Sequence, residues 1–438
     1  MPPNPAADPV LAATLPNGVR VLVLQLPGRP SVDVSVFVHA GSQHESARGN
    51  GIGHVVEHMA FKGTAARDCQ RINLDAERLG AQVDAHTDKD HCAFRMFGLA
   101  HDAGAFIDML ADIVLHATFP ADELERERQV ILHEYAEDDD DPMSVAFRDF
   151  DKLCFGEHPL AQPVIGQRRN IRRFTRDELL AHVRQHYCGA NTVLAVAGDV
   201  DPAQIVQRAR SAFGGMPAGA AGAVPPPQHV GGLVTRALSG SGQTHVVLGF
   251  PVPSLRGAHQ AACVAAALFG EGMSSPLMDQ LRERRALVYY AACSADVLEL
   301  AGQFVVEAST SPQQLDEYLR ELTRLLLQHA EHIDTDALER AQRQIAVREL
   351  RTLERPARRL ESAALDLFAL GRVRAHAETL GALQAVNATQ VRDAFAAMLN
   401  AGAAIAVAGK VGRGADARLR ELAQPLLKTR HRPGGPRH

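Results

Sequence analysis

The sequence predicts an α+β fold of two duplicated domains, each a mainly antiparallel sheet with helices packed on one face. In each half of the chain, short runs typical of strands come before several amphipathic helical segments. The runs Leu194–Val200 and Ala403–Val411 (LAVAGDV and AAIAVAGKV) nearly repeat each other, and both lie near the end of their half. An internal duplication explains this repeat, and coincidence in a short apolar strand is the alternative. A chain of 438 residues also exceeds what one hydrophobic core usually serves.

The first half opens with the turn dipeptide Asn17-Gly18 inside an apolar strand pattern. An acidic run and Pro142 mark the expected end of the long helix before them. The residues from 156 to 175, which include Pro159, Pro163 and Gly166, are expected to form an irregular loop. We expect strands within Leu15–Leu26, Ser31–Ala40, Ala81–Leu99 and Thr192–Val200, and helices at Asn50–Phe61, Ile72–Leu79, Asp102–Ala117, Ala121–Glu137, Arg176–His186 and Pro202–Phe213.

A Gly/Ala/Pro-rich stretch, Gly214–Gly232, has almost no charge and no amphipathic period, which is typical of a linker. We therefore expect domains at 1–213 and 233–438. The basic tail from Lys428 is expected to fray. In the second half we expect strands at Gly242–Phe250, Leu287–Leu298, Gly302–Ser309 and Ala403–Val411, and helices at His259–Phe269, Pro276–Arg284, Pro312–His332, Asp336–Leu353, Ala357–Leu370 and Thr379–Met398.

Composition excludes several classes of protein. Hydrophobic residues make up 46% and charged residues 22%, as in an ordinary globular protein, and the net charge of −5 argues against a nucleic-acid partner. No apolar run approaches the ~20 residues of a membrane span. The N-terminus shows no secretory leader, so we expect a cytoplasmic protein, with the periplasm as the alternative if a leader has been cleaved. The six scattered cysteines fit a reducing compartment.

The chemistry concentrates in the expected helix Asn50–Phe61, which carries the pattern H-x-x-E-H at His54, Glu57 and His58. Histidines four apart lie on one face of a helix, so both imidazoles can reach one metal ion. A glutamate on the same face can reach a water beside that ion. The alternative is a solvated face with two unrelated histidines, but the apolar neighbours in this segment favour a buried helix, in which His and Glu need partners.

A catalytic zinc usually has three protein ligands, so a third must come from elsewhere. Glu127 and Glu134 lie seven residues apart, hence on one face of the expected helix Ala121–Glu137, with apolar residues between them. A charge on a stripe that faces the core is costly unless it is paired or bound to metal. The alternative, a solvated acidic face, suits the other glutamates better: Glu123, Glu125 and Glu137.

Five segments give the chain a resemblance to a known family. GIGHVVEHMAFKGT from Gly51, with ERERQVILHE from Glu125, looks like the pitrilysin and mitochondrial processing peptidase family of inverted zincins, and the resemblance continues through HPLAQPVIG from His158 and TVLAVAGDV from Thr192. In the second half it covers FGEGMSSPLMDQLRERRALVYY from Phe269. The likeness therefore spans most of the chain, in the manner of two-domain bacterial processing-peptidase-like proteins.

The resemblance implies a role for each site residue. By it, His54, His58 and Glu134 bind Zn²⁺ and Glu57 is the general base. Glu127 matches a glutamate that supports the metal-binding helix. Arg282 and Tyr289, seven apart, match a pair that binds substrate and polarises the scissile carbonyl; taken alone, this spacing is commonplace.

The resemblance further implies a zinc-dependent endopeptidase that cleaves peptides or unfolded segments inside a clamshell chamber. A homodimer, or a heterodimer with a related subunit, is expected. The alternatives are the catalytic subunit of a heterodimer whose partner lacks zinc, and a non-catalytic scaffold or core-type subunit.

The chain departs from the family pattern at three positions: Pro276 stands where the family often has Arg, Ala286 where it has Gly, and His133 where an acidic residue is common. These departures put substrate preference in doubt and leave the metal site untouched. Three further histidines, His44, His91 and His158, are interpreted as ordinary polar or loop residues.

Overall fold

The computed structural model describes residues 8–427, and the chain divides into two compact units that each draw on both halves of the sequence. Among the described residues, unit 1 comprises 8–138, 158–225 and 347–381, and unit 2 comprises 139–157, 226–346 and 382–427. Residues 217–231, within the expected linker, are irregular. The division at 213 and 233 stays a prediction, and the expected fraying of the tail falls outside the described residues.

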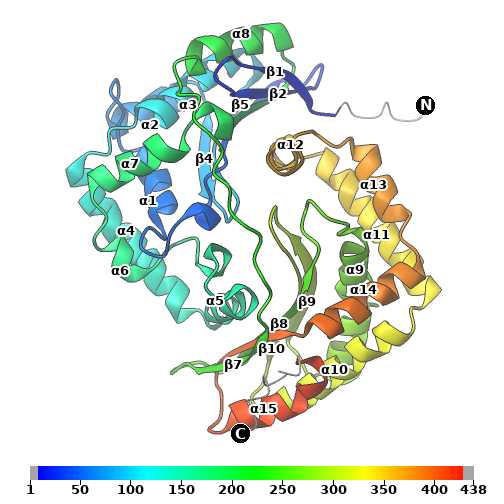
Figure 1. The fold of residues 1–438 in the computed structure, drawn as a ribbon. Coiled ribbons are helices and arrows are strands. Elements are labelled where there is room, and N and C mark those ends of the chain that lie inside the picture. The colour runs from blue at the N-terminus through cyan, green and yellow to red at the C-terminus, as the bar shows by residue number, and fades with distance from the viewer. Residues whose placement is uncertain (1–7, 428–438) are drawn as a thin grey trace, which may run out of the picture. The chain divides into compact units, whose positions relative to one another are not determined.

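Unit 1 is built on a six-stranded sheet with the strand order β1-β2-β6-β3-β5-β4 (Figure 1). The β2–β6 pair is parallel and all the other pairs are antiparallel. Strand β4 therefore forms one edge of the sheet, where it pairs with β5. The strands are β1 Val10–Thr14, β2 Arg20–Gln25, β3 Ser31–Val38, β4 Gln82–Thr87, β5 Cys92–Leu99 and β6 Thr192–Gly198.

The helices of the first half, apart from the segment Pro142–Phe155, lie on one face of this sheet. Alternate strand residues such as Val21, Val23 and Val34 point toward them and form the main core of the unit. Helix α1 packs against β4 and α7, which positions it beside the edge of the sheet. The helices are α1 Ile52–Ala60, α2 Cys69–Arg78, α3 Ala103–His116, α4 Ala121–Asp140, α6 Arg168–Ile171, α7 Arg176–His186 and α8 Pro202–Phe213.

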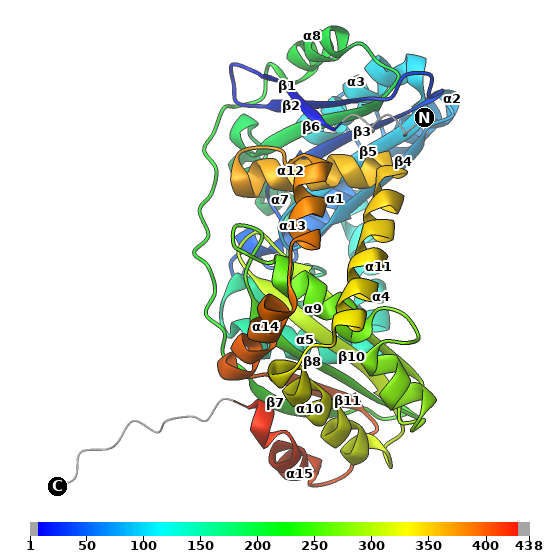
Figure 2. The same ribbon diagram turned by 90° about the vertical axis from the view of Figure 1, so that its right-hand side faces the viewer.

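A single helix from late in the chain, α12 (Pro356–Leu370), covers the opposite face of the sheet (Figures 1 and 2). Leu360 and Leu367 of α12 belong to a second buried cluster with Leu22 and Leu24, the strand residues that point away from the main core. Arg20 also donates a 3.0 Å hydrogen bond to the carbonyl oxygen of Leu367. The expectation that helices pack on one face of the sheet therefore holds for most helices of unit 1, but α12 lies on the opposite face.

Unit 2 repeats the topology with a five-stranded sheet in the order β7-β11-β8-β10-β9. The β7–β11 pair is parallel and the others are antiparallel, so β11 occupies the place that β6 has in unit 1. Strands β6 and β11 hold the two near-repeated segments. The predicted α+β class and the duplication are confirmed. The strands are β7 Gly232–Ala237, β8 Thr244–Val252, β9 Tyr290–Val297, β10 Gly302–Thr310 and β11 Ala404–Gly409.

The second sheet is also covered on both faces. On one side lie α9 and α14, with α10 packed on α14; on the other lies α5 (Pro142–Phe155), a segment of the first half. Phe150 of α5 packs so closely on Gly249 that a Cβ there would lie 2.7 Å from its ring. The remaining helices are α9 Gln260–Gly270, a π-helical turn at Met278–Glu283, α10 Leu315–Glu331, α11 Thr335–Leu353, α13 His376–Gln384, α14 Ala388–Ala401 and α15 Ala415–Leu422.

Three expectations were wrong in detail. The segment 156–175 is not irregular throughout, because it holds a 3₁₀ turn at Pro159–Ala161 and the short helix α6. Pro142 does not simply close a helix; it is the first residue of α5, with Asp141 as the N-cap that accepts a hydrogen bond from Ser144 N. The single helix expected at Thr379–Met398 is two helices, because Asn387 starts α14 with a capping box to Gln390.

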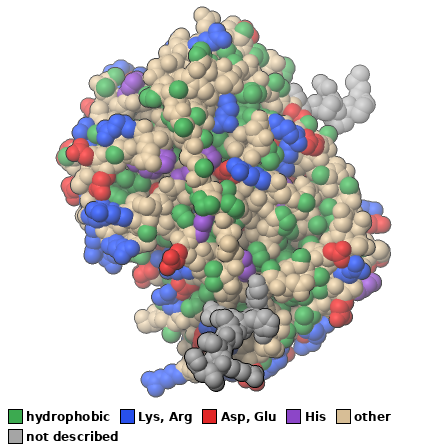
Figure 3. Space-filling model, in the orientation of Figure 1, with side chains coloured by type: hydrophobic (Ala, Val, Ile, Leu, Met, Phe, Trp, Pro, Cys, Tyr) green, Lys and Arg blue, Asp and Glu red, His purple; other side chains and the backbone are tan. Residues whose placement is uncertain are grey.

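The surface carries side chains of both charges. Acidic and basic side chains are interspersed over the face shown in Figure 3. Among residues 8–427, no helix combines the length and the apolar character needed to cross a bilayer.

Candidate active site

Helix α1 begins at a glycine that the local packing requires. Gly51 has φ +96°, which favours glycine, and a Cβ there would lie 2.6 Å from Gly166 Cα. Gly166 has φ +89°, and a Cβ there would lie 2.3 Å from Gly51 Cα. The backbones of two motifs, GIGHVVEH and HPLAQPVIG, therefore touch at the start of α1. The two motifs are more than 100 residues apart in sequence.

Glu45 holds the N-terminus of α1, a role that the sequence did not reveal. Its carboxylate accepts hydrogen bonds from the backbone N–H groups of Gly51 (2.7 Å) and Gly53 (2.8 Å) and from Asn50 Nδ2 (3.1 Å). The helix otherwise lacks a side-chain cap, and its first N–H groups need acceptors. Burial raises the pKa of Glu45 to about 7, although these three hydrogen bonds act in the opposite direction.

This buried carboxyl makes stability depend on pH. The folded state binds the Glu45 proton more tightly than the unfolded state, whose pKa is near 4.5, so stability falls as the pH rises from 4.5 to about 7. We expect the metal-free protein to lose about 3 kcal/mol of unfolding free energy over this window relative to its Glu45→Gln variant. Urea denaturation of both proteins from pH 4.5 to 8 measures the difference, and parallel profiles would contradict the assignment.

Two turns of α1 and one face of α4 bring three potential ligands together. The ligand atoms of His54, His58 and Glu134 all lie within 4.8 Å of one another. The distance from His58 Nε2 to Glu134 Oε2 is 3.6 Å, and the two imidazole rings lie 4.6 Å apart, edge to face. The sequence predicted this group of residues, and the structure places all three in one cluster within unit 1.

Glu127 approaches His58 from the other side of its ring. His58 Nδ1 lies 3.1 Å from Glu127 Oε2, and Lys62 Nζ lies 2.7 Å from Glu127 Oε1. With Nδ1–H donating to this carboxylate, Nε2 is left with its lone pair toward Glu134 and His54. Glu127 thus fixes both the orientation of the ring and the tautomer that a metal needs.

Glu57 is placed by a hydrogen bond from strand β4. Thr87 Oγ1 donates to Glu57 Oε2 at 2.7 Å, at the end of the edge strand. Burial raises the pKa of Glu57 above its usual value, while the Thr87 hydrogen bond and the charge of His58 act against this rise. A carboxylate with a raised pKa is a better base at neutral pH than a free one.

The donor set fits a zinc ion. Two imidazoles and a carboxylate are common ligands of catalytic zinc, and ligand atoms about 2.0–2.2 Å from a tetrahedral ion lie about 3.4 Å from each other, close to the 3.6 Å between His58 and Glu134. Burial, and then the neighbouring His58, lowers the pKa of His54 to about 4, so its imidazole is neutral at pH 7, as a ligand must be. Nδ1 of His54 is buried without a hydrogen-bond partner among the described residues.

Arg282 and Tyr289 lie in unit 2, and both side chains are available to a ligand. Arg282 belongs to the π-helical turn, and Tyr289, just before β9, is 81% exposed. Between them Ala286 has φ +49°, in the left-handed region that favours glycine. This backbone explains why the family often has glycine there, and it shows that the turn keeps its conformation without one.

The sequence matches two family models, which together cover most of both halves. Residues 20–168 match the model described as insulinase (peptidase family M16), and residues 173–345 match the model described as peptidase M16 inactive domain. A protein of Rickettsia bellii named an uncharacterized zinc protease is 31% identical over 76% of this chain and 81% of its own length. The chain belongs to peptidase family M16. The resemblance to the pitrilysin family is thereby confirmed.

Other M16 relatives and solved structures agree. The uncharacterized zinc protease Rv2782c of Mycobacterium tuberculosis is 33% identical over 73% of this chain and 76% of its own length. Among solved structures, a peptidase M16 inactive domain from Pseudomonas fluorescens has a TM-score of 0.84 at 22% identity, covering 91% of this chain and 98% of its own. A protease from Helicobacter pylori has a TM-score of 0.84 at 20% identity, covering 93% and 99%. These structures show that this M16 protein shares their two-domain fold.

Proposed function

We propose that this M16 protein is a zinc-dependent endopeptidase that cleaves peptides or unfolded segments. The observation that carries the proposal is the cluster of His54, His58 and Glu134 beside Glu57, which supplies three ligands and a base on one side of unit 1. The names of the relatives, which call them zinc proteases, support the same metal and reaction.

Each side chain of the cluster has a part in the proposed reaction. His54, His58 and Glu134 would hold the zinc ion, which when bound polarises a carbonyl group and acidifies water. Glu57 accepts a proton from the attacking water and delivers it to the leaving amine. Thr87 holds the carboxylate of Glu57 through the hydrogen bond to Oε2, and Glu127 holds the ring of His58.

Strand β4 offers a place for an extended peptide. It lies at the edge of the sheet, several of its side chains are exposed, and its last residue, Thr87, bonds to Glu57. An exposed edge presents unpaired backbone N–H and C=O groups, to which a peptide can add as a further strand. A peptide bound there would run toward the base and the ligand cluster. This mode of binding favours unfolded segments over folded proteins.

The proposal includes residues of unit 2 and an assembly. Arg282 and Tyr289 would bind substrate and polarise the scissile carbonyl, as their match to the family pair implies; an arginine or tyrosine donor stabilises the developing oxyanion. We also propose a dimer, either of identical subunits or with a related subunit, in the cytoplasm. Sedimentation of the chain, alone and co-expressed with related subunits, tests the assembly.

A non-catalytic subunit is the second candidate. The match of residues 173–345 to a model described as an inactive domain favours it, although that segment does not contain the ligand cluster. Retention of three ligands, the base and the supporting Glu127 favours catalysis, because a scaffold has no need of them. A catalytic subunit that requires a zinc-free partner would show the same residues.

Digestion of a peptide library tests the proposal. The purified chain should cleave peptides in zinc-containing buffer, lose this activity in the presence of a chelator and recover it when zinc is restored. Absence of cleavage by the chain alone and with co-expressed related subunits would favour the non-catalytic candidate. Cleavage that persists in chelator would exclude the metal mechanism.

Glu127→Gln should weaken zinc binding by roughly tenfold to a hundredfold. The variant keeps the size of the side chain but removes the charge that pairs with Lys62 and accepts the His58 Nδ1–H hydrogen bond. Competition with a chromogenic chelator measures the affinity. Glu137→Gln is the matched control, since Glu137 lies on the same helix, is exposed and contacts His133 at 3.6 Å. Equal affinities in the two variants would refute the supporting role of Glu127.

A further inference from the structure

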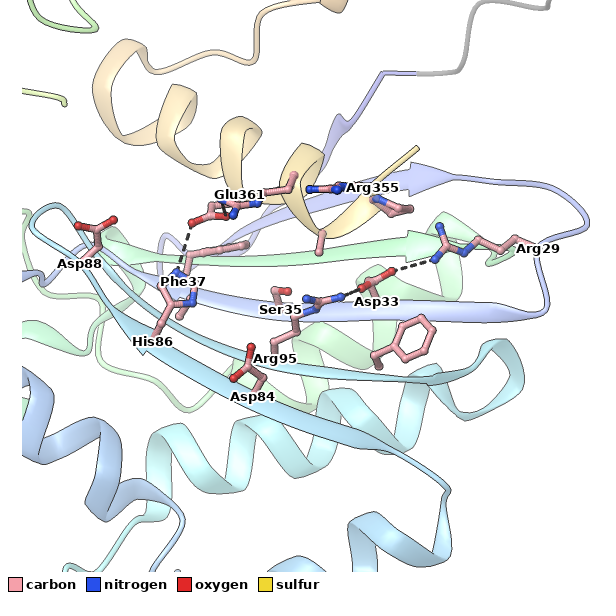
Figure 4. A pocket seen from close by; sticks show the side chains of 15 residues that line it. Arg29, Asp33, Ser35, Phe37, Asp84, His86, Asp88, Arg95, Arg355 and Glu361 are labelled. Atoms are coloured by element: carbon pink, nitrogen blue, oxygen red, sulfur yellow. Dashed lines mark hydrogen bonds and ion pairs between the residues drawn. The ribbon is translucent and has the colours of Figure 1, made fainter. Parts of the chain in front are cut away.

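A second group of potential metal ligands lies on the opposite side of the β4 edge, within unit 1. His86 is in β4, His91 directly precedes β5, and Glu361 projects from α12. Their ligand atoms all lie within 4.8 Å of one another. Figure 4 shows His86 and Glu361 pointing toward each other across the space between the sheet and α12. The group shares no residue with the His54, His58 and Glu134 cluster.

The distances in this group match those between ligands of one ion. Nε2 of His86 lies 3.2 Å from Glu361 Oε1, and Nε2 of His91 lies 3.5 Å from the same oxygen. Ligands about 2.0–2.2 Å from a tetrahedral ion are separated by about 3.4 Å, whereas an N–H···O hydrogen bond is about 2.7–3.2 Å long. The 3.2 Å contact of His86 is itself a hydrogen bond, whereas the 3.5 Å contact of His91 is longer than one and close to the spacing that a shared ion would impose.

The surroundings of His91 are not explained if hydrogen bonds alone hold this group together. The side chain is 2% exposed, and neither ring nitrogen makes a hydrogen bond of ordinary length among residues 8–427: Nε2 has the 3.5 Å contact with Glu361 Oε1, and Nδ1 is buried without a hydrogen bond. A buried polar atom without a partner is costly, and the cost is relieved if Nε2 binds a metal ion. The sequence had indicated an ordinary polar histidine here. The structure instead directs its ring toward Glu361, beside Phe37.

The hairpin and the helix fix the three side chains without a metal. The β4–β5 pairing sets His86 opposite Ala93 and brings the rings of His86 and His91 to a centroid distance of 5.4 Å. Glu361 Oε2 faces Arg358 at 3.7 Å, which leaves Oε1 for the histidines. A pocket of about 510 Å³, lined by His86, Glu361 and Asp88 among others, adjoins the group.

We infer that His86, His91 and Glu361 form a second binding site for a divalent transition-metal ion. Two imidazoles and one carboxylate favour Zn²⁺, Co²⁺ or Ni²⁺ over Mg²⁺ or Ca²⁺, which prefer oxygen ligands. An ion bound there joins α12 to the β4–β5 hairpin, and so links Glu361 to a strand residue 275 positions earlier. This inference does not depend on the proposed peptidase activity.

The test counts zinc ions bound per chain. Wild-type protein and the Glu361→Gln and His86→Ala variants are dialysed against zinc from 1 to 100 μM, and bound zinc is measured by elemental analysis. We expect two ions per wild-type chain and one in each variant. His86 is half-exposed, so its substitution reports on the site even if Glu361→Gln disturbs the packing of α12. His101→Ala, which removes an exposed histidine elsewhere in unit 1, is the matched control and should retain two.

Two further measurements make the outcome decisive. The His58→Ala variant should retain one ion, which should be lost when Glu361→Gln is added; this separates the second site from the first and from any question of catalysis. Zinc should also raise the melting temperature of His58→Ala and leave that of the double variant unchanged. The inference would be overturned if the wild type bound only one zinc ion and Glu361→Gln still bound that ion. Loss of an ion in His101→Ala would overturn it as well.

Discussion

Glu57→Gln is expected to keep zinc bound while peptide cleavage falls by about 10²- to 10⁴-fold, the usual contribution of a general base. The amide keeps the size of the side chain and can still accept the hydrogen bond from Thr87, but it cannot take a proton from water. The ligands His54, His58 and Glu134 are unchanged, so zinc content should stay at the wild-type value. Steady-state cleavage of a fluorogenic peptide, together with elemental analysis, measures both quantities.

The matched control for this variant is Glu137→Gln, an exposed glutamate-to-glutamine change on α4 that should leave cleavage intact. Full activity in Glu57→Gln would remove this residue as the base. Loss of zinc together with activity would instead assign Glu57 to metal binding.

His58→Ala is expected to abolish zinc binding at the first site. His58 lies between the two carboxylates, with Nε2 toward Glu134 and Nδ1 toward Glu127, so its removal takes away one of three ligands and the contact that orients it. Elemental analysis after dialysis into metal-free buffer should show one zinc fewer than in the wild type, and peptide cleavage should disappear.

His133→Ala provides the comparison for His58→Ala. This histidine is adjacent to Glu134 in sequence, but it is exposed and contacts Glu137, so its loss should not change zinc content. An unchanged zinc content in His58→Ala would refute the ligand assignment.

The cluster of His54, His58 and Glu134 could be predicted because much of its geometry is local to two helices. Residues four apart on α1 and seven apart on α4 necessarily share a face, and the resemblance then paired the two helices. The structure confirms that these faces meet, since His58 contacts both Glu127 and Glu134.

What the sequence did not reveal depends on contacts between distant segments. The fit of Leu360 and Leu367 against Leu22 and Leu24 has no local signature, so α12 could not be assigned to the first sheet. The same holds for Glu361 beside His86 and for Glu45 at the start of α1. The start of α5, by contrast, could have been predicted from the sequence, because Asp141-Pro142 is a recognisable pair of N-cap and first helical residue.

The most direct test of the account is a crystal grown in zinc, with anomalous diffraction recorded on both sides of the zinc absorption edge. The account predicts a zinc peak bonded to one imidazole nitrogen each of His54 and His58 and to an oxygen of Glu134, about 2.0–2.2 Å from each, with Glu127 on the far side of the His58 ring. A zinc-soaked crystal with no peak among these three side chains, or with the three turned toward different partners, would contradict it.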